Sequence, residues 1–483
     1  MNFLKPLIFI LLFFNTLFSI YLVFKRPRSI ATTWAWLILL NVLPVLGFLL
    51  YAFFGRGLAE ENLMSISAQK EVGLDFAKKL EKESLNYDNP NDTTQDARLV
   101  IDYFNYDYKN PLSKKNDVNF FTDGASKFKK LFKDIIKAKY SVHVEYYTFY
   151  DDAIGHDFIT LLEDKAREGV EVKLIYDPWG SVGNSSSFFD NLERLGGIVV
   201  PFITSRNMIR KYRLNYHLHR KIVVIDGQIG WTGGFNVGDQ YLGRKKKFGY
   251  WRDTHVRIVG PATLLLQERF VLDFNASVQD NKNKIVFRQD LFPNPSSTSR
   301  DNTAIQIVSD GPEQEEDFLK NGVIRLMNIA RHKIWIQTPY LVPDDSMIST
   351  LVIAARSGID VKIMIPCKPD HPFIYRATQY YANYLTKYGI EIYIYNNGFL
   401  HAKTVIVDDK FATVGSMNQD FRSYMLNFEA NAFFYDKKIS RQLSQHFKHD
   451  MKDCTLLTQN MINQQSQSLK LKQQVSRLLS PIL

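Results

Sequence analysis

The sequence predicts an α/β protein in which two repeated α/β/α halves pack about a pseudo-twofold axis, preceded by a hairpin of two apolar helices. Three observations indicate this arrangement. A helix-period segment followed by a glycine and a β-branched run occurs at 158–177 and again at 348–366. A motif of His, Lys, Asp and Asn also occurs twice, at 219–236 and 401–418. Two long apolar runs precede both repeats.

The composition is that of a folded, basic protein. A chain of 483 residues has room for a membrane segment and two or three compact domains. Apolar residues make up 45% and charged residues 23%, which excludes a disordered chain. The net charge of +10 favours polyanions, for which nucleic acid and an anionic lipid surface are the candidates. Cys367 and Cys454 are the only cysteines, which excludes a zinc finger and argues against a disulfide framework.

The N-terminal region, 1–58, predicts two transmembrane helices. The run 6–24 is almost entirely apolar, three cations and a proline interrupt it at 25–28, and a second apolar run covers 30–54. A cleaved signal peptide is disfavoured, because the first run is long for one and a second run follows. The loop of the hairpin carries three cations, whereas the flanking segments carry two, Lys5 and Arg56. This difference is too small to decide which side of the membrane holds the remainder of the chain.

The rest of the chain divides into a linker and two halves. Residues 59–115 are polar and predict a juxtamembrane linker. The first half covers 116–295, and the second half covers 296–483 with a C-terminal helical tail. Each half contains a strand, a helix and a second strand, with Gly169 or Gly358 where a helix C-terminus belongs. Such βαβ units predict a mostly parallel sheet.

The repeated motif has the form H-x-K-x4-D-x6-G-[GS]-x-N. At average residue frequencies one match arises by chance about once in a hundred thousand chains of this length. A single strand histidine is usually an ordinary core or surface residue, so the duplication in register is what favours catalysis. The candidate residues are His219, Lys221, Asp226 and Asn236 in the first copy, and His401, Lys403, Asp408 and Asn418 in the second.

Strand geometry divides the motif residues into two groups. Residues at i and i+2 share one face of a strand, so His219 and Lys221 point the same way, as do His401 and Lys403. The two aspartates have the opposite parity, and we expect them to brace the strand ends. The small pairs 233–234 and 415–416 allow close backbone approach, and each motif asparagine then offers an amide donor.

Packing about a twofold axis would collect both copies in one pocket suited to a phosphodiester. The lysines would neutralise phosphate charge, one neutral histidine would attack phosphorus, and the other histidine, protonated, would supply a proton to the leaving alcohol. The neighbouring cations are expected to separate the pKa values of the two histidines. No carboxylate cluster of metal-ligand type accompanies the motif, so no metal and no other cofactor is expected.

The twin motif resembles that of the phospholipase D superfamily, whose members carry two H-K-D motifs and form a phosphohistidine intermediate. The resemblance covers about 120–450 and, with the N-terminal hairpin, is closest to the bacterial cardiolipin synthases. The stretches 250–258 and 418–423 also resemble those enzymes. The resemblance implies that Asp253 and Glu429 orient the histidine rings, that His219 is the nucleophile and that His401 is the acid. Gly234 stands where the second motif has Ser416, which removes one hydroxyl donor to phosphate.

The resemblance implies a multi-pass enzyme of the bacterial plasma membrane that transfers a phosphatidyl group between two phosphatidylglycerol molecules. Its partners would be anionic phospholipid and the membrane, with no nucleic acid. Hydrolysis to phosphatidic acid is the alternative, because only the acceptor differs, and a nuclease of the same superfamily is the second. The nucleophile, the acceptor preference and the oligomeric state stay open.

Three further segments have two interpretations each. The basic clusters 210–213 and 244–247 are either solvated loops or contacts to anionic headgroups. The segment 469–479 is either a helix on the membrane surface or an ordinary docking helix.

Overall fold

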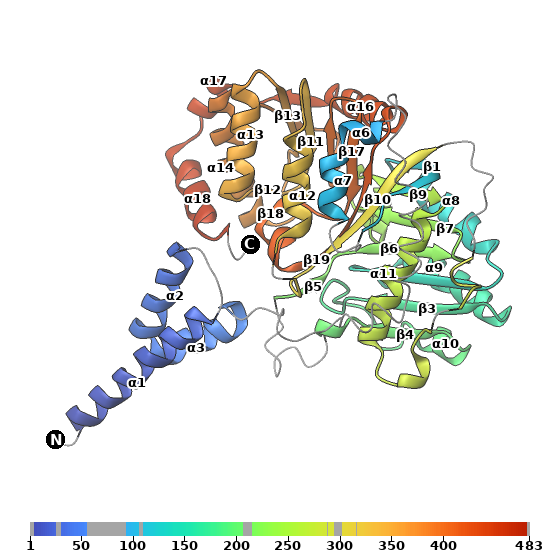
Figure 1. Ribbon diagram of the computed structural model, residues 1–483, viewed down its shortest axis with the longest axis horizontal. Helices are drawn as coiled ribbons and strands as arrows, with labels where there is room; N and C mark the ends of the chain where they lie inside the picture. The colour runs from blue at the N-terminus through green and yellow to red at the C-terminus, as the bar shows by residue number, and fades with distance from the viewer. Residues whose placement is uncertain are drawn as a thin grey trace.

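The computed structural model describes residues 4–25, 30–55, 93–105, 110–205, 215–286, 288–293, 302–314 and 316–480 (Figure 1). The basic cluster 210–213 and most of the expected linker lie outside these residues, as do Arg26 and Arg28 of the predicted hairpin loop.

The N-terminal segment forms a helical hairpin, but its second arm is broken. Its elements are α1 (Leu4–Phe24), α2 (Ile30–Val42), α3 (Pro44–Leu50) and the π-helical turn η1 (Tyr51–Gly55). The break falls at Leu43, whose φ of −126° is outside the helical range. Pro44 lacks an N–H donor and disfavours helix at the residue before it, so the run 30–54 is not one continuous helix. Within the part of the chain that the structure describes, no helix meets the length and apolarity that crossing a membrane requires.

The first half is built on a mixed sheet with the strand order β4-β3-β2-β6-β7-β9-β1. Helices α8 and α9 pack on one face of the sheet, and α11 packs on the other. The strands are β1 (Ser113–Phe121), β2 (Ser141–Tyr146), β3 (Glu171–Tyr176), β4 (Ile198–Pro201), β6 (Lys221–Ile225), β7 (Ile229–Gly233) and β9 (His255–Val259). The helices are α8 (Gly124–Ile136), α9 (Ala153–Arg167), α10 (Asp190–Arg194) and α11 (Ala262–Ser277).

The second half repeats this plan with the order β14-β13-β11-β16-β17-β19-β10, and β20 (Cys454–Leu456) lies at the outer edge. Its strands are β10 (Thr303–Asp310), β11 (Lys333–Gln337), β13 (Asp360–Pro366), β14 (Glu391–Tyr395), β16 (Thr404–Val407), β17 (Phe411–Gly415) and β19 (Asn427–Phe434). Its helices are α12 (Phe318–Met327), α13 (Asp345–Arg356), α14 (Pro372–Leu385), α15 (Phe421–Met425), α16 (Lys437–Met451), α17 (Gln459–Asn463) and α18 (Gln467–Leu478).

Strands β1 and β10 join the two sheets by antiparallel pairing, and the strand order mirrors itself on either side of this junction. This is the relationship that a pseudo-twofold axis between the two strands produces. In the main sheet of each half, the parallel pairs among the described strands are confined to β2-β3-β4 and β11-β13-β14. The prediction of a mostly parallel sheet is therefore wrong, because the strand signal of each motif forms a tight antiparallel hairpin (β6–β7 and β16–β17) with the next strand.

Helix ends follow the sequence signals in both halves. Asp152 and Asp344 are the N-caps of α9 and α13, where their side chains accept the N–H of Gly155 and Met347. Gly169 and Gly358 have φ of 83° and 85°, the left-handed conformation expected where these helices end.

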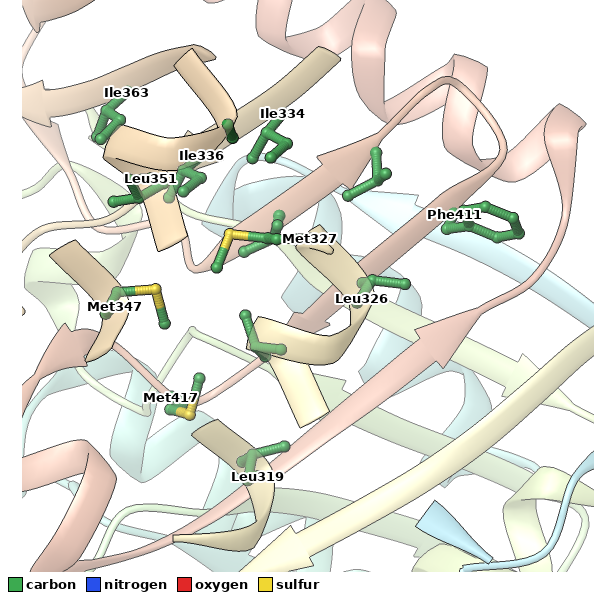
Figure 2. Close-up of a cluster of buried hydrophobic side chains, with 14 of the residues drawn as sticks. Leu319, Leu326, Met327, Ile334, Ile336, Met347, Leu351, Ile363, Phe411 and Met417 are labelled. Carbon is green, nitrogen blue, oxygen red and sulfur yellow. The ribbon is translucent and has the colours of Figure 1, made fainter. Parts of the chain in front are cut away.

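The second half has an apolar core to which part of the expected linker contributes. Figure 2 shows side chains of α12, α13 and the sheet meeting in this core, among them Met327, Leu351 and Ile363. Helices α6 (Thr93–Asp96) and α7 (Arg98–Phe104) pack against the same half (Figure 1). The ring centroid of Phe104 lies 4.4 Å from that of Phe433, and Phe104 is fully buried. Residues 93–105 therefore contribute to the folded core, since Ala97, Val100, Ile101 and Phe104 are fully buried.

Candidate active site

Each motif strand is interrupted at its histidine and reaches into the opposite half. The segment before His219 forms β5 (His217–Leu218), which pairs with β19 of the second half. The segment before His401 forms β15 (Phe399–Leu400), which pairs with β8 (Trp251–Arg252) of the first half. The backbone N–H of His219 donates to Phe428 O at 2.9 Å, and that of His401 to Arg252 O at 2.7 Å. The segment 217–225 thus forms two short strands, β5 and β6, which pair in different halves.

One pocket of 410 Å³ is lined by residues of both motifs. His219, His401, Asn236 and Asn418 all line it, and each is less than a tenth exposed. The side chains therefore meet at the junction of the two halves although they lie far apart in the sequence. Aromatic rings from both halves complete the walls, namely those of Tyr147, Trp179, Tyr241, Phe248, Trp251 and Tyr340.

The two histidines are held by carboxylates of the opposite half. Nδ1 of His219 lies 2.8 and 2.9 Å from the two carboxylate oxygens of Glu429. Nδ1 of His401 lies 2.6 Å from Oδ2 of Asp253. Both carboxylates are fully buried. A carboxylate accepts from Nδ1–H, which leaves Nε2 of each imidazole as the nitrogen available for chemistry.

Burial governs the ionisation of both histidines. Desolvation lowers the pKa of His219 to about 4, against the opposing effect of Glu429. Desolvation, together with Lys403, likewise lowers the pKa of His401 to about 4. Both imidazoles are therefore neutral near pH 7. The expected separation of the two pKa values is wrong, because each ring is buried beside a carboxylate and a lysine.

The motif lysines lie beneath the pocket. Lys221 and Lys403 are buried, and each Nζ donates to the backbone carbonyl of its own motif histidine at 2.5 Å. Desolvation lowers the pKa of Lys221 to about 7 and that of Lys403 to about 8. Their positive charge offsets the burial of the two acids. Burial alone would raise the pKa of Glu429, but His219 and Lys221 hold that pKa below its usual value.

Asp226 and Asp408 lie away from the pocket, as strand parity predicts. The carboxylate of Asp226 accepts the backbone N–H groups of residues 139, 140 and 141, at 2.7 to 2.9 Å for the shortest contact of each. Asp408 does the same for residues 331, 332 and 333 at 2.7 to 2.8 Å. Both have a positive φ, 52° and 55°, which aspartate tolerates better than most residues. They tie the hairpin of each motif to the start of the neighbouring strand in the sheet, β2 or β11.

The small residues after each motif strand make room for polar side chains. A Cβ on Gly234 would lie 2.0 Å from Oδ1 of Asp253, and one on Gly415 would lie 2.0 Å from Oδ1 of Asn431. The hydroxyl of Ser416 bonds the backbone N–H and C=O of Ala430. Ser416 is therefore committed to the scaffold, so the expectation that it donates to phosphate is not met here.

The motif asparagines differ in their partners. Nδ2 of Asn236 donates to the hydroxyl of Tyr241 at 3.0 Å, and its Oδ1 accepts the N–H of Thr148 at 3.3 Å. Oδ1 of Asn418 is buried, and no partner for it is found among the residues that the structure describes. The two asparagines therefore differ, because the amide oxygen of Asn236 accepts a backbone bond and that of Asn418 has no partner among the described residues.

Sequence reasoning missed several pocket residues. His217 and Arg422 line the pocket beside Asn427, and Arg422 is held by Asn215 at 2.7 Å. His217 could have been predicted, because residues two apart on a strand share one face and His217 is two residues before His219. Tyr340 and Asp370 line the other end, and nothing in the sequence pattern indicates them. In the described part of the chain, no cluster of three His, Cys, Asp or Glu side chains is placed to hold a metal.

Comparisons with known proteins agree on one family. The family described as "Cardiolipin synthase, PLD-like domain" matches residues 131–249 and 323–451, more than half of the chain. The chain is 43% identical to a cardiolipin synthase of Listeria innocua over the full length of both proteins. The chain belongs to the cardiolipin synthase family. This confirms the resemblance predicted from the twin H-K-D motif.

Further matches cover almost the whole chain, including its N-terminal segment. The major cardiolipin synthase ClsA of Bacillus subtilis is 43% identical over 97% of both chains. Residues 8–56 match the family described as "Phospholipase_D-nuclease N-terminal". Among solved structures, a phosphatidylserine synthase of Haemophilus influenzae aligns with a TM-score of 0.57 and 16% identity over 76% of this chain and 95% of that one. That likeness concerns the fold alone.

Proposed function

We propose that the protein is a phosphatidyltransferase that makes cardiolipin and glycerol from two molecules of phosphatidylglycerol. The observation that best supports this is the pair of pocket histidines, each held through Nδ1 by a buried carboxylate of the other half. A single pocket with two such imidazoles provides a nucleophile and a proton carrier for one phosphodiester. Membership of the cardiolipin synthase family supports the choice of substrate.

In the first step, Nε2 of His219 attacks phosphorus of a bound phosphatidylglycerol. A phosphorus–nitrogen bond forms, the bond from phosphorus to the headgroup oxygen breaks, and protonated His401 gives that oxygen a proton. Glycerol leaves, and His401 becomes neutral. The low pKa of His401 rises when the anionic phosphodiester binds, because a nearby negative charge favours the imidazolium.

In the second step, neutral His401 takes the proton from a headgroup hydroxyl of a second phosphatidylglycerol. The hydroxyl oxygen attacks phosphorus, the phosphorus–nitrogen bond breaks, and His219 is released with cardiolipin as product. Lys221 and Lys403, buried below the histidines, stabilise the negative charge that builds on phosphorus oxygens in both steps. Glu429 supports the positive charge that His219 gains when it bears the phosphatidyl group.

We also propose that residues 4–55 attach the enzyme to the bacterial plasma membrane. Many large apolar side chains of α1 to α3 face outward, including Phe9 at 72%, Trp34 at 60% and Val45 at 88% exposure. Exposed apolar area of this kind is costly in water and favours insertion among lipid chains. Attachment would keep the pocket next to a supply of both substrates.

The product assay tests this function. Purified protein, mixed with phosphatidylglycerol vesicles and a chelator, should give cardiolipin and free glycerol in equal amounts. Mass spectrometry measures both products. Phosphatidic acid as the main product would instead establish a hydrolase, which the same two histidines could also support. The variants His219→Ala and His401→Ala serve as blanks for contaminating activity.

A further inference from the structure

The two ends of the pocket differ in charge. At the His219 end, His217 and Arg422 line the wall, and a phosphate oxygen would meet hydrogen-bond donors there. At the other end, Asp370 lines the wall together with Tyr340. Two acids line the pocket, Asp370 and Asp420, and Asp420 is the N-cap of α15, where its carboxylate accepts the N–H of Ser423. Asp370 stands beside Tyr340 in a pocket that must also take an anionic group. Such a carboxylate repels phosphate, so the ligand group beside it must be uncharged and must donate a hydrogen bond.

The Asp370 carboxylate is fixed in place with acceptor capacity to spare. The hydroxyl of Tyr340 donates to Oδ2, and the backbone N–H of His371 donates to Oδ1 at 2.7 Å. An ionised carboxylate has about four acceptor positions, so about two remain for a ligand. Tyr340 is itself well packed, and burial raises its pKa well above the usual value, which keeps its hydroxyl a donor.

The matching loop of the first half does not offer the same group. There the carboxylate that follows β3 is Asp177, whose oxygens accept the N–H of Trp179 at 2.8 Å and of Leu218 at 2.9 Å. Asp177 is fully buried and does not line the pocket. The pocket is therefore asymmetric at this position although both halves carry the motif His, Lys, Asp and Asn.

Asp370 belongs to the end of the pocket that contains His401. Its charge acts on both His401 and Lys403, where it opposes the lowering of their pKa values by burial. His401 is the residue that exchanges a proton with the headgroup hydroxyl in the proposed function. The alcohol that leaves in the first step and the alcohol that attacks in the second must therefore lie at this end.

We propose that Asp370, held by Tyr340, binds the central hydroxyl of the glycerol headgroup and so selects acceptors that carry it. This rests on the proposed function. The terminal hydroxyl of the same glycerol reacts at phosphorus, and the central hydroxyl, on the adjacent carbon, donates to the carboxylate. The same contact holds the leaving glycerol in the first step, because the leaving alcohol and the attacking alcohol occupy the same position beside His401. A buried-site hydrogen bond to a charged acceptor corresponds to about a ten- to hundredfold preference over an acceptor without the hydroxyl.

Competition between two small acceptors tests this inference. Phosphatidylglycerol vesicles are supplied with equal concentrations of deuterated glycerol and propane-1,3-diol, which lacks the central hydroxyl, and the two phosphatidyl products are measured by mass spectrometry. Both products arise from one intermediate, so their ratio does not depend on how fast the enzyme is loaded. Wild-type protein should favour glycerol about ten- to a hundredfold, and Asp370→Asn should bring the ratio close to one.

Two further variants make the result decisive. Tyr340→Phe keeps the carboxylate but removes its donor, so the preference should fall partway. Asp360→Asn is the matched control, because this acid lies on β13 of the same half and pairs with Lys362 outside the pocket. An unchanged ratio in both Asp370→Asn and Tyr340→Phe would overturn the inference, as would a wild-type ratio near one. Absence of cardiolipin from the wild-type protein would instead reject the proposed function.

Discussion

Glu429, on strand β19 of the second half, binds Nδ1 of His219 in the first half through both carboxylate oxygens, at 2.8 and 2.9 Å. The reciprocal contact joins Asp253 of the first half to His401 of the second. Neither motif is complete within its own half. The crossing follows from β5 and β15, which precede the two histidines and pair with strands of the opposite half, β19 and β8.

The change Glu429→Gln should lower cardiolipin formation by about 10²- to 10⁴-fold, because an amide cannot support a positive charge on His219. The rate at saturating phosphatidylglycerol is the measurement. Glu391→Gln is the matched control, since that acid lies on β14 beside Lys362 and away from the pocket. Activity of Glu429→Gln equal to that of the control would contradict the role of the crossed pair.

The two histidines should be distinguishable by trapping. With phosphatidylglycerol labelled in its phosphate, His401→Asn should accumulate label on the protein. His219 can still be loaded without the acid, whereas the second step, which unloads it, lacks its base. His219→Asn should accumulate none, because the proposed nucleophile is absent. Acid-labile label is measured after a rapid quench at high pH. Label on His219→Asn but not on His401→Asn would reverse the assignment.

Asp226→Ala should destabilise the protein rather than disable its chemistry. The change removes three backbone hydrogen bonds and places alanine at a positive φ, which together cost about 2–4 kcal/mol in the free energy of unfolding. Urea unfolding gives this value, and activity is measured well below the melting temperature. Asp408→Ala should behave alike. A stable but inactive Asp226→Ala variant would place this aspartate in the chemistry after all.

His255→Phe should reduce the sensitivity of stability to acid. His255 is fully buried, and neither ring nitrogen has a partner among the described residues, so burial holds its pKa well below the usual value. In the unfolded chain this histidine binds a proton near pH 6.5, whereas in the folded protein it stays neutral. The free energy of unfolding therefore falls as the pH drops below that value. The loss from one such histidine between pH 7.5 and 5 reaches about 2 kcal/mol.

Urea unfolding of wild type and His255→Phe at pH 7.5 and pH 5 measures this difference. The phenyl ring keeps most of the volume and removes the titration, so the variant should lose less stability between the two values. His156→Phe is the control, since that ring is 64% exposed and pairs with Asp151. Equal pH dependence in wild type and His255→Phe would show that this histidine stays protonated or finds a partner.

Much of the site was predictable because it depends on local chemistry. Strand parity separates Asp226 and Asp408 from the histidines, and the structure places their carboxylates on backbone N–H groups outside the pocket. The glycines at 169 and 358 end their helices as expected. Other predictions failed. The second apolar run is broken at Pro44, a local effect of proline that the prediction of one continuous helix overlooked. The mostly parallel sheet and the separated histidine pKa values failed because strand pairing and burial depend on the tertiary structure.

The sequence by itself determined the family, the two halves and the residues of both motifs, because a repeated pattern of side chains is legible without coordinates. Only the tertiary structure decided that Glu429 holds His219 and that Asp253 holds His401, since the spacing of each acid from its motif does not say which ring it reaches. It also decided that Asp370 stands in the pocket while Asp177 is buried against backbone N–H groups. The physical reason is that these distant side chains are brought together by strand pairing between the halves, of β1 with β10, β5 with β19 and β15 with β8, which the spacing of residues in the sequence does not encode.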